Sequence, residues 1–394
     1  MVPEGAVTDG GADQMRARQK FTSISLAGLL VAGFVVAGCG GNSSSETSTS
    51  TSAGTGVAAA KQQLERLYAG TFTNAPESGP KPKSDQNIWL VSCGQALISC
   101  SAPIASAEEA AKSLGWKTRV VDGKFDPSQY AAGIRQALAA GADGIITFAI
   151  DCPLVKQPLA EAEKAGVPTV SMESINCPDG GYTNVVDYVE GDFATWETQW
   201  GASKATYLAA KTDGNAKVID FYDDETQASA LIDVGFRKEL KKCSGCEIVD
   251  RVGFTAAELG PKLQQKTEQA LLKNPDANAV QVPFDAAMLS GISAAIKSSG
   301  RGKDLLIIGG EGYAPAVDLI RAGVEQDAGS ASPGGWEGYA AVDAMNRLLN
   351  GQEPVPTGMG LQIFDATHNI AKSGGWEPAA DYRAQYAKAW GTTP

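Results

Sequence analysis

The sequence predicts an α/β protein with two lobes, each a parallel sheet flanked by helices. Between residues 88 and 349, apolar strand-like runs alternate with segments that have helical periodicity, several of which end at a glycine. The alternation restarts after a long helix predicted at roughly 193–211. Each series holds about five strands, and right-handed crossovers place successive helices in order over one sheet. Two similar lobes therefore fit the pattern better than one large sheet.

Short apolar runs give the expected strands of each series. The first series is expected at 88–92, 118–122, 144–150, 167–172 and 183–186. The second series is expected at 217–222, 247–252, 279–282, 305–308 and 325–328. The helices between them are expected at 106–114, 127–140, 154–165, 226–241, 256–273, 285–299, 315–322 and 336–349.

The N-terminus has the features of an export signal. Basic residues at 16–20 precede an uncharged stretch, 24–38, of about 15 residues, which is shorter than the about 20 needed to cross a bilayer. The stretch ends in Val36-Ala37-Gly38-Cys39, which resembles the bacterial lipobox. That resemblance implies cleavage after residue 38 and a lipid on Cys39, and the alternative is an ordinary signal peptide with a chance cysteine. Met15 is an alternative start to Met1.

The predicted domain boundaries follow from these patterns. Residues 1–38 form the lipoprotein signal peptide, and 39–57, which begins with a long Gly/Ser/Thr run, forms a flexible tether. Residues 58–85 form an N-terminal helix, expected at 58–68, and a connector. The remaining ranges are an N-terminal lobe at 86–190 plus 333–357 and a C-terminal lobe at 191–332 plus 358–394.

Composition excludes several classes of function. With 33 Lys+Arg against 45 Asp+Glu, the net charge of −12 argues against nucleic acid as a partner. The single histidine, His368, leaves little room for a His-rich zinc site. The sequence also contains no P-loop and no nucleophile elbow. We therefore expect no metal and no cofactor.

The cysteines fit an exported protein. With Cys39 assigned to the lipid, six remain, and an even number outside the cytosol suggests disulfides. Six cysteines allow 15 pairings. We predict the pairs Cys93–Cys100, Cys152–Cys177 and Cys243–Cys246. The last pair has the spacing of a redox motif, but it is expected between a helix and a strand, where no helix N-terminus would stabilise a thiolate.

Ligands of open α/β sheets bind beyond the C-terminal ends of the strands, and polar and aromatic residues gather there in this sequence. Carboxylates accept hydrogen bonds from hydroxyl or cationic groups, and aromatic rings pack on sugar faces or attract cations. Arginine and lysine are nearly absent from these positions, so a neutral polyhydroxy or a cationic ligand is expected. Any single carboxylate of the set has the alternative role of capping a helix. The candidate ligand-binding residues are Gln95, Asp151, Glu173, Asp187, Tyr222, Asp223, Phe254, Phe284, Asp285, Glu311 and Trp336.

From residue 86 to about 365 the chain resembles the type I periplasmic binding proteins of ABC importers, especially the sugar-binding branch. The segments that carry the resemblance are EEAAKSLG at 108–115, IRQALAAGADG at 134–144, AGVPTV at 165–170 and IIGGEG at 307–312. The resemblance implies two Rossmann-like lobes joined by a three-segment hinge that close over one small molecule. It also implies delivery to a membrane permease that is driven by a separate ATPase.

The chain departs from the sugar branch at several ligand positions. Glu173-Ser174 stands where that branch usually has Asp-Arg, Phe284-Asp285 where it has Asn-Asp, and Glu311 where it has Asp. Ile232 replaces an arginine, and a loop bounded by Cys93 and Cys100 replaces paired aromatics. These differences leave the fold prediction intact and point to a ligand other than a common sugar.

The sequence thus predicts a solute-binding lipoprotein, monomeric and not an enzyme, anchored outside the cell membrane through Cys39. Two alternatives remain. The first is an exported glycoside hydrolase that uses Glu173 and Asp285, since such chemistry needs two carboxylates. The second is a sensor that passes its ligand to a membrane receptor.

Overall fold

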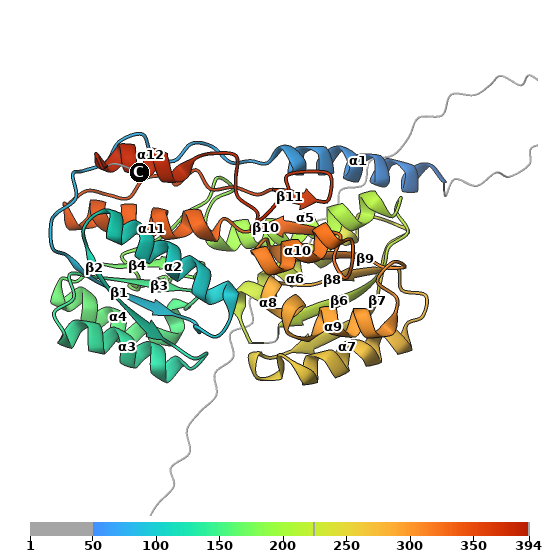
Figure 1. The fold of residues 1–394 in the computed structure, drawn as a ribbon, viewed down its shortest axis with the longest axis horizontal. Helices are drawn as coiled ribbons and strands as arrows, with labels where there is room; N and C mark the ends of the chain where they lie inside the picture. Colours follow the sequence, from blue (N-terminus) through green and yellow to red (C-terminus); the bar gives the residue numbers. More distant parts are fainter. Residues whose placement is uncertain (1–49, 224, 393–394) are drawn as a thin grey trace, which may run out of the picture. The chain divides into compact units, whose positions relative to one another are not determined.

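A computed structural model describes residues 50–223 and 225–392, and it confirms the predicted α/β architecture with two parallel sheets (Figure 1). The N-terminal lobe has a five-stranded sheet in the order β2-β1-β3-β4-β5, with every neighbouring pair parallel. Its strands are β1 Asn87–Ser92, β2 Lys117–Asp122, β3 Gly144–Phe148, β4 Thr169–Met172 and β5 Asn184–Val185.

The C-terminal lobe has a six-stranded sheet in the order β11-β10-β9-β8-β6-β7. All neighbouring strands are parallel except the edge pair β10 and β11, which is antiparallel. Its strands are β6 Lys217–Asp223, β7 Glu247–Phe254, β8 Ala279–Gln281, β9 Leu306–Glu311, β10 Ala328–Ala331 and β11 Ile363–Asp365. The central strands of both sheets are fully buried, as their continuous apolar runs require.

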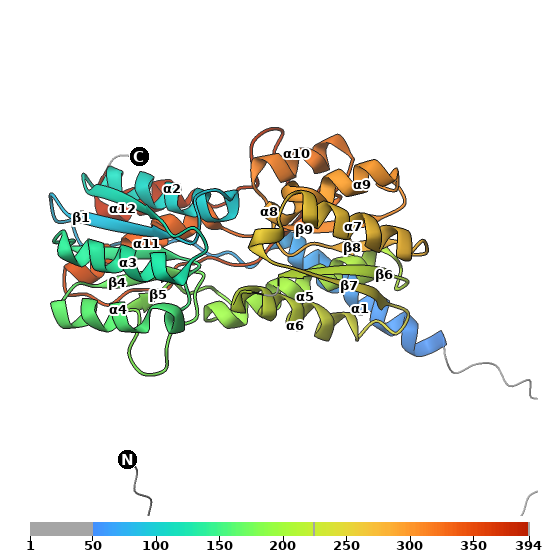
Figure 2. The same cartoon turned by 90° about the horizontal axis from the view of Figure 1, so that it is seen from below.

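Helices cover the faces of both sheets, and Figure 2 shows them from below. The N-terminal lobe carries α2 Ile98–Ser113, α3 Pro127–Ala139, α4 Cys152–Ala165, α11 Gly334–Leu349 and α12 Tyr382–Trp390. The C-terminal lobe carries α1 Ser50–Ala69, α5 Phe193–Lys211, α6 Gln227–Leu240, α7 Pro261–Lys273, α8 Asp285–Ala287, α9 Ser293–Ser299 and α10 Ala314–Ala322. In the part of the chain described, no helix has the length and apolar character of a membrane span.

Five described segments pass between elements of the two lobes: 186–192, 332–333 and 350–362, and also 70–86 after α1 and 366–381 before α12. The first and third lie side by side, because Val189 N donates to Met359 O at 2.7 Å and Thr357 Oγ1 donates to Asp187 O at 2.6 Å. The connector after α1 joins them, with Thr73 N donating to Gly358 O at 2.9 Å. This bundle of extended segments forms the connection between the lobes.

Several element boundaries differ from the predicted ones, since α2 begins at Ile98 rather than at 106, β10 spans Ala328–Ala331 rather than 325–328, and the helix predicted at 285–299 is interrupted between α8 and α9. Two differences change the predicted domain boundaries. Helix α1 begins at Ser50, within the segment predicted as a flexible tether, because Val57 packs against Gly214 of the C-terminal lobe and extends the helix toward the N-terminus. Helix α12 packs on α11, where Trp390 Nε1 donates to Asp343 Oδ1 at 2.8 Å, so the C-terminal residues lie with the N-terminal lobe rather than the C-terminal one. The predicted signal peptide, Cys39 and the start of the tether lie outside the described residues.

Disulfides join Cys93 to Cys100, Cys152 to Cys177 and Cys243 to Cys246, which are the pairs expected from the sequence. The Cys152–Cys177 bridge links the start of α4 to the loop after β4. The Cys243–Cys246 bridge lies between α6 and β7. Both positions fit a structural role, because they join segments at the ends of buried elements.

Helices α5 and α6 cross in close contact, and two glycines permit it. A Cβ atom on Gly235 would lie 1.8 Å from Thr198 O, and one on Gly201 would lie 2.1 Å from Ile232 O. Both obstructing atoms belong to the backbone, so a side-chain rotation cannot relieve either overlap. The approach fixes α5, which carries part of the candidate site described below.

We expect Gly235→Ala to lower the free energy of unfolding by about 1–3 kcal/mol, since overpacking forces the two helices apart. Urea unfolding followed by circular dichroism measures this loss. Gly133→Ala is the matched control, because its Cβ would meet side-chain atoms of Val121 and Val91 rather than backbone. Equal stability of Gly235→Ala and the wild type would contradict the close crossing.

Candidate ligand-binding site

A cavity of about 480 Å³ lies between the lobes and is lined by residues from both. The N-terminal lobe contributes the loops that follow β1, β2, β3 and β4. The C-terminal lobe contributes helix α5 and the loops that follow β6, β7, β8 and β9. The cavity therefore lies at the C-terminal strand ends of both sheets, where open α/β sheets bind ligands.

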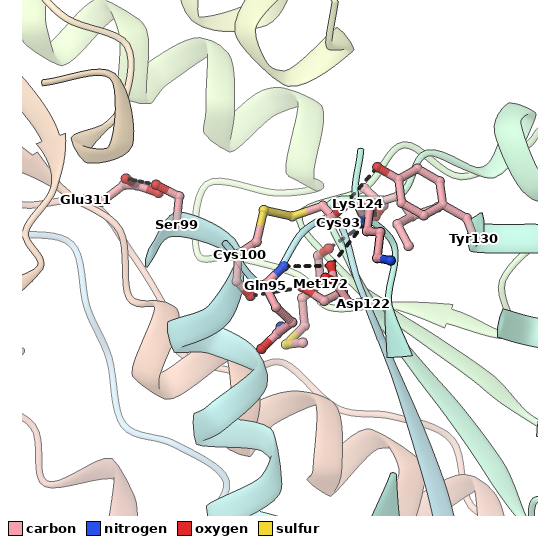
Figure 3. Close-up of a disulfide and its surroundings, with 12 residues drawn as sticks. Cys93, Gln95, Ser99, Cys100, Asp122, Lys124, Tyr130, Met172 and Glu311 are labelled. Atoms are coloured by element: carbon pink, nitrogen blue, oxygen red, sulfur yellow. Dashed lines mark hydrogen bonds between the residues drawn. A yellow bond between two sulfur atoms is a disulfide. The ribbon is translucent and has the colours of Figure 1, made fainter. Parts of the chain in front are cut away.

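The disulfide Cys93–Cys100 shapes one wall of the cavity (Figure 3). Tyr130 donates its hydroxyl hydrogen to Cys93 O at 3.2 Å, which ties the loop after β1 to helix α3. Ser99, at the start of α2, donates to Glu311 Oε2 of the other lobe at 2.6 Å. The stiffened loop thus presents a hydroxyl group to a carboxylate across the cavity.

Helix α5 supplies a second wall through Trp196, Glu197 and Trp200. The two tryptophan rings stack with centroids 6.0 Å apart, and Trp200 Nε1 donates to Ala331 O at 3.1 Å. Behind Trp200 lies the fully buried Lys204, whose Nζ is 3.7 Å from the centroid of the tryptophan ring. Burial lowers the pKa of Lys204 to about 7.

The cavity lining is acidic and aromatic, and none of its described residues is basic. An anionic ligand would need arginine or lysine, which this lining does not provide. The carboxylates are Asp151, Glu173, Glu197, Asp223, Glu225 and Glu311, and the aromatic residues are Phe125, Tyr130, Phe148, Trp196, Trp200 and Phe284.

Glu311 is held at the end of β9 by the neighbouring Asp285. Asp285 N donates to Glu311 Oε2 at 2.7 Å, and Asp285 Oδ2 accepts from Gly312 N and Tyr313 N, both at 2.8 Å. This turn fixes Glu311 at a φ of 61°, in the left-handed region. Burial raises the pKa of Glu311 to about 7, and burial together with Glu311 raises the pKa of Asp285.

Glu173 and Glu337 form a buried carboxyl pair. Ser332 Oγ donates to Glu173 Oε1 at 3.1 Å, and Tyr188 donates its hydroxyl hydrogen to Glu337 Oε1 at 3.0 Å. Burial, and then the charge of Glu337, raises the pKa of Glu173, while burial raises the pKa of Glu337 to about 8. The pair therefore holds a proton near neutral pH, and only Glu173 of the two lines the cavity.

Five of the eleven candidate residues line the cavity: Asp151, Glu173, Asp223, Phe284 and Glu311. They lie at or just after the C-terminal ends of β3, β4, β6, β8 and β9. The expectation that ligands bind beyond these strand ends therefore located them. A hydrogen bond from Ile175 N at 2.7 Å holds the carboxylate of Asp151, while Thr226 Oγ1 donates to Asp223 Oδ2 at 3.1 Å.

The other six candidates lie elsewhere. Gln95 packs beside the first loop, with its backbone N–H bonded to Asp122, and Asp187 binds Thr357 in the connection between the lobes. The ring of Tyr222 lies 4.1 Å from the Arg251 guanidinium, and Phe254 is buried behind Phe284. The last two, Asp285 and Trp336, are fully buried. Asp285 accepts hydrogen bonds from the turn after β9, and Trp336 Nε1 donates to the hydroxyl oxygen of Tyr386.

Sequence reasoning did not find the contribution of α5. Its Trp196 and Trp200 are spaced by four residues and share one face of the helix, which equally predicts a core position. Ser99, Thr226, Ser229 and Ser332 were missed because hydroxyl residues near strand ends are common in turns. The feature of the sequence that could have indicated this wall is Glu197, a charged residue between Trp196 and Trp200 on a largely buried helix.

The family of periplasmic binding protein domains matches residues 100–353, more than half of the chain. The chain belongs to this family. It is a type I periplasmic binding protein, as the resemblance of its sequence predicted. Both lobes and the cavity between them fall largely inside the matched range.

Relatives of this periplasmic binding protein include a ribose import binding protein of Haemophilus influenzae, 24% identical over 224 residues, which cover 55% of this chain and 70% of that protein. A 5-methylthioribose transporter solute-binding protein of Thermotoga lettingae, solved with 5-methylthioribose, has a TM-score of 0.64 at 18% identity and covers 78% of this chain and 94% of its own. An ABC transporter solute-binding protein of Actinobacillus succinogenes, solved with D-allose, has a TM-score of 0.63 at 17% identity and covers 72% and 98%. At these identities the solved structures establish the fold alone.

Proposed function

We propose that this protein is the extracytoplasmic solute-binding lipoprotein of an ABC importer and captures a small, sugar-like polyhydroxy or cationic ligand between its lobes. The observation that carries the proposal is the cavity of about 480 Å³ at the strand ends of both sheets, lined by carboxylates and aromatic rings. Aromatic faces pack on the apolar faces of a polyol ring, and carboxylates accept hydrogen bonds from its hydroxyl groups. The ribose, methylthioribose and allose named for its relatives belong to the same chemical class.

The hydrolase alternative is weaker than the binding function. It named Glu173 and Asp285 as the two catalytic carboxylates, but only Glu173 lines the cavity. Both oxygens of Asp285 are buried, and Oδ2 already accepts two backbone N–H groups. Because Asp285 does not reach the cavity, Glu173 and Asp285 cannot act as the two opposed carboxylates that glycoside hydrolysis needs.

The lipid anchor at Cys39 and the permease belong to the same proposal. The lipobox-like Val36-Ala37-Gly38-Cys39 supports cleavage and lipidation, and the family's role in transport supports a membrane permease with its own ATPase as the partner. Labelling with a fatty-acid analogue tests the anchor, since Cys39→Ser should remove the label. A sensor that signals to a receptor would bind the same ligand in the same cavity, so a gene deletion that abolishes uptake of the ligand separates the two roles.

Ligand capture is tested by a thermal-shift screen of pentoses, hexoses, polyols and their aminated derivatives, with dicarboxylic acids as anionic controls. A ligand present at about 100 times its dissociation constant should stabilise the protein by about 2.7 kcal/mol, because it binds only the folded state. A shift produced by anionic acids alone would contradict the proposal, since the cavity offers them no basic side chain.

A further inference from the structure

The carboxylate of Glu197 has no hydrogen-bond partner among the described residues, although the residue is only 5% exposed and lines the cavity. The half-buried Glu173 and the buried Glu311, which also line the cavity, are both bonded. Glu173 accepts from Ser332 and Glu311 accepts from Ser99. A buried carboxylate without a donor carries a large desolvation cost, so a donor from outside the protein is the natural complement.

Lys204 acts on Glu197 through its charge but forms no hydrogen bond or ion pair with it. Lys204 lies one helical turn beyond Trp200 on α5, and its Nζ donates to Val282 O at 2.9 Å and to Pro283 O at 2.6 Å. It lies against the Trp200 ring and is absent from the cavity lining. The interior of the cavity therefore faces Glu173, Glu197 and Glu311 and no positive side chain among its described lining residues.

The electrostatics of the cluster match this geometry. Burial raises the pKa of Glu197, and the charges of Glu173 and Glu311 raise it further, while the charge of Lys204 lowers it and offsets part of the effect. Each charge added to the cluster disfavours the next, so a positive group between the three glutamates would relieve their mutual repulsion. Among residues 50–223 and 225–392, no three acidic, cysteine or histidine side chains are arranged to coordinate a metal ion.

The rings beside Glu197 favour an organic cation. Trp196 and Trp200 flank it on the same helix, and both line the cavity. Lys204 already lies over the Trp200 ring and Tyr188 stacks on Trp196 at 4.4 Å, so the rings supply apolar packing surface for an organic ligand. Its ammonium group would be held by charge-assisted hydrogen bonds to the carboxylates, which are strong. The other carboxylates of the lining can accept hydrogen bonds from the hydroxyl groups of a ligand; they are Asp151, Asp223 and Glu225.

We infer that the ligand is an aminated polyol, with its ammonium group bound by Glu197 between Glu173 and Glu311 and its hydroxyl groups by the other lining residues. This inference rests on the proposed function and specifies its ligand class. On this inference, the preference for an amine over a neutral sugar depends on one residue, Glu197, rather than on the overall acidity of the cavity.

The test compares each neutral polyol with its amine. Isothermal titration calorimetry and thermal shift are run on D-glucose and D-glucosamine, D-galactose and D-galactosamine, and D-sorbitol and 1-amino-1-deoxy-D-sorbitol, with N-acetyl-D-glucosamine as the uncharged amide. Tris is excluded from all buffers because it is itself an aminated polyol. We expect at least one amine to bind about tenfold or more tightly than its neutral parent, as an added charge-assisted hydrogen bond implies.

Glu197→Gln assigns the effect to one side chain. The variant should fold, because the replaced carboxylate bonds to nothing in the protein, and it should lose about tenfold or more of its affinity for the amine. Its affinity for the neutral parent should change much less. Glu163→Gln, on the exposed surface of α4, is the control for charge and should bind as the wild type does.

The outcomes separate the inference from the function. Neutral parents that bind as tightly as their amines, or an amine whose affinity survives Glu197→Gln, overturn the inference and leave solute binding standing. A protein that binds no polyol of the panel, aminated or neutral, overturns both. A preference for the amine that Glu197→Gln abolishes supports both.

Discussion

Trp200→Ala should lower the free energy of unfolding by about 3–5 kcal/mol and should also abolish detectable ligand binding. The ring is 2% exposed and packs so closely on Gly310 that a Cβ there would lie 2.4 Å from Trp200 Cη2. Removing it opens a void that joins the cavity, and it deletes the hydrogen bond to Ala331 O. Lys204 also loses the ring over which its ammonium group lies.

Two measurements on two variants separate packing from binding. Urea unfolding gives the stability, and calorimetry with a ligand found in the screen gives the affinity. Trp390→Ala is the matched control, because Trp390 is also 2% exposed but packs between α12 and α11, outside the cavity lining. Both variants should lose stability, and only Trp200→Ala should lose affinity. Equal affinities in the two would exclude Trp200 from the ligand site.

The fold was predictable because local patterns determine it. Buried parallel strands read as short apolar runs, such as 144–150, and glycines that end helices, such as Gly166 with a φ of 70°, mark the boundaries. The elements that sequence reasoning placed wrongly depend on distant contacts. The sequence of α12 does not indicate which lobe it packs against. Its position on the N-terminal lobe depends on the contact of Trp390 with Asp343 of α11.

The site was predictable only in part, for the same reason. The rule of strand ends locates residues at the correct edge of a sheet, and it found Glu173 and Glu311. It does not determine which side chains turn inward, and so it also selected the fully buried Trp336. Glu197 lies near the start of α5, and it reaches the cavity because that helix begins the second lobe directly after the segment that connects the lobes. No local pattern records that placement.

Asp285 illustrates how a residue outside the cavity can determine its chemistry. Its Oδ2 accepts both N–H groups of the turn after β9, while Oδ1 is buried with no partner among the described residues. Burial and the nearby Glu311 raise the pKa of Asp285, while the two backbone N–H groups and Lys204 act in the opposite direction. Glu311 keeps its left-handed conformation because this turn is held in place.

Asp285→Ala should therefore lower the free energy of unfolding by about 2–6 kcal/mol, since two amide donors lose their acceptor at about 1–3 kcal/mol each. Affinity should fall with it, because Glu311 is released from the turn. Asp285→Asn should stay within about 1 kcal/mol of the wild type, since an amide oxygen accepts the same two bonds and the uncharged amide has nearly the same shape. Urea unfolding of the three proteins at neutral pH measures both effects. If asparagine is as damaging as alanine, the carboxylate is ionised and its charge, rather than its shape, holds Glu311 in the cavity.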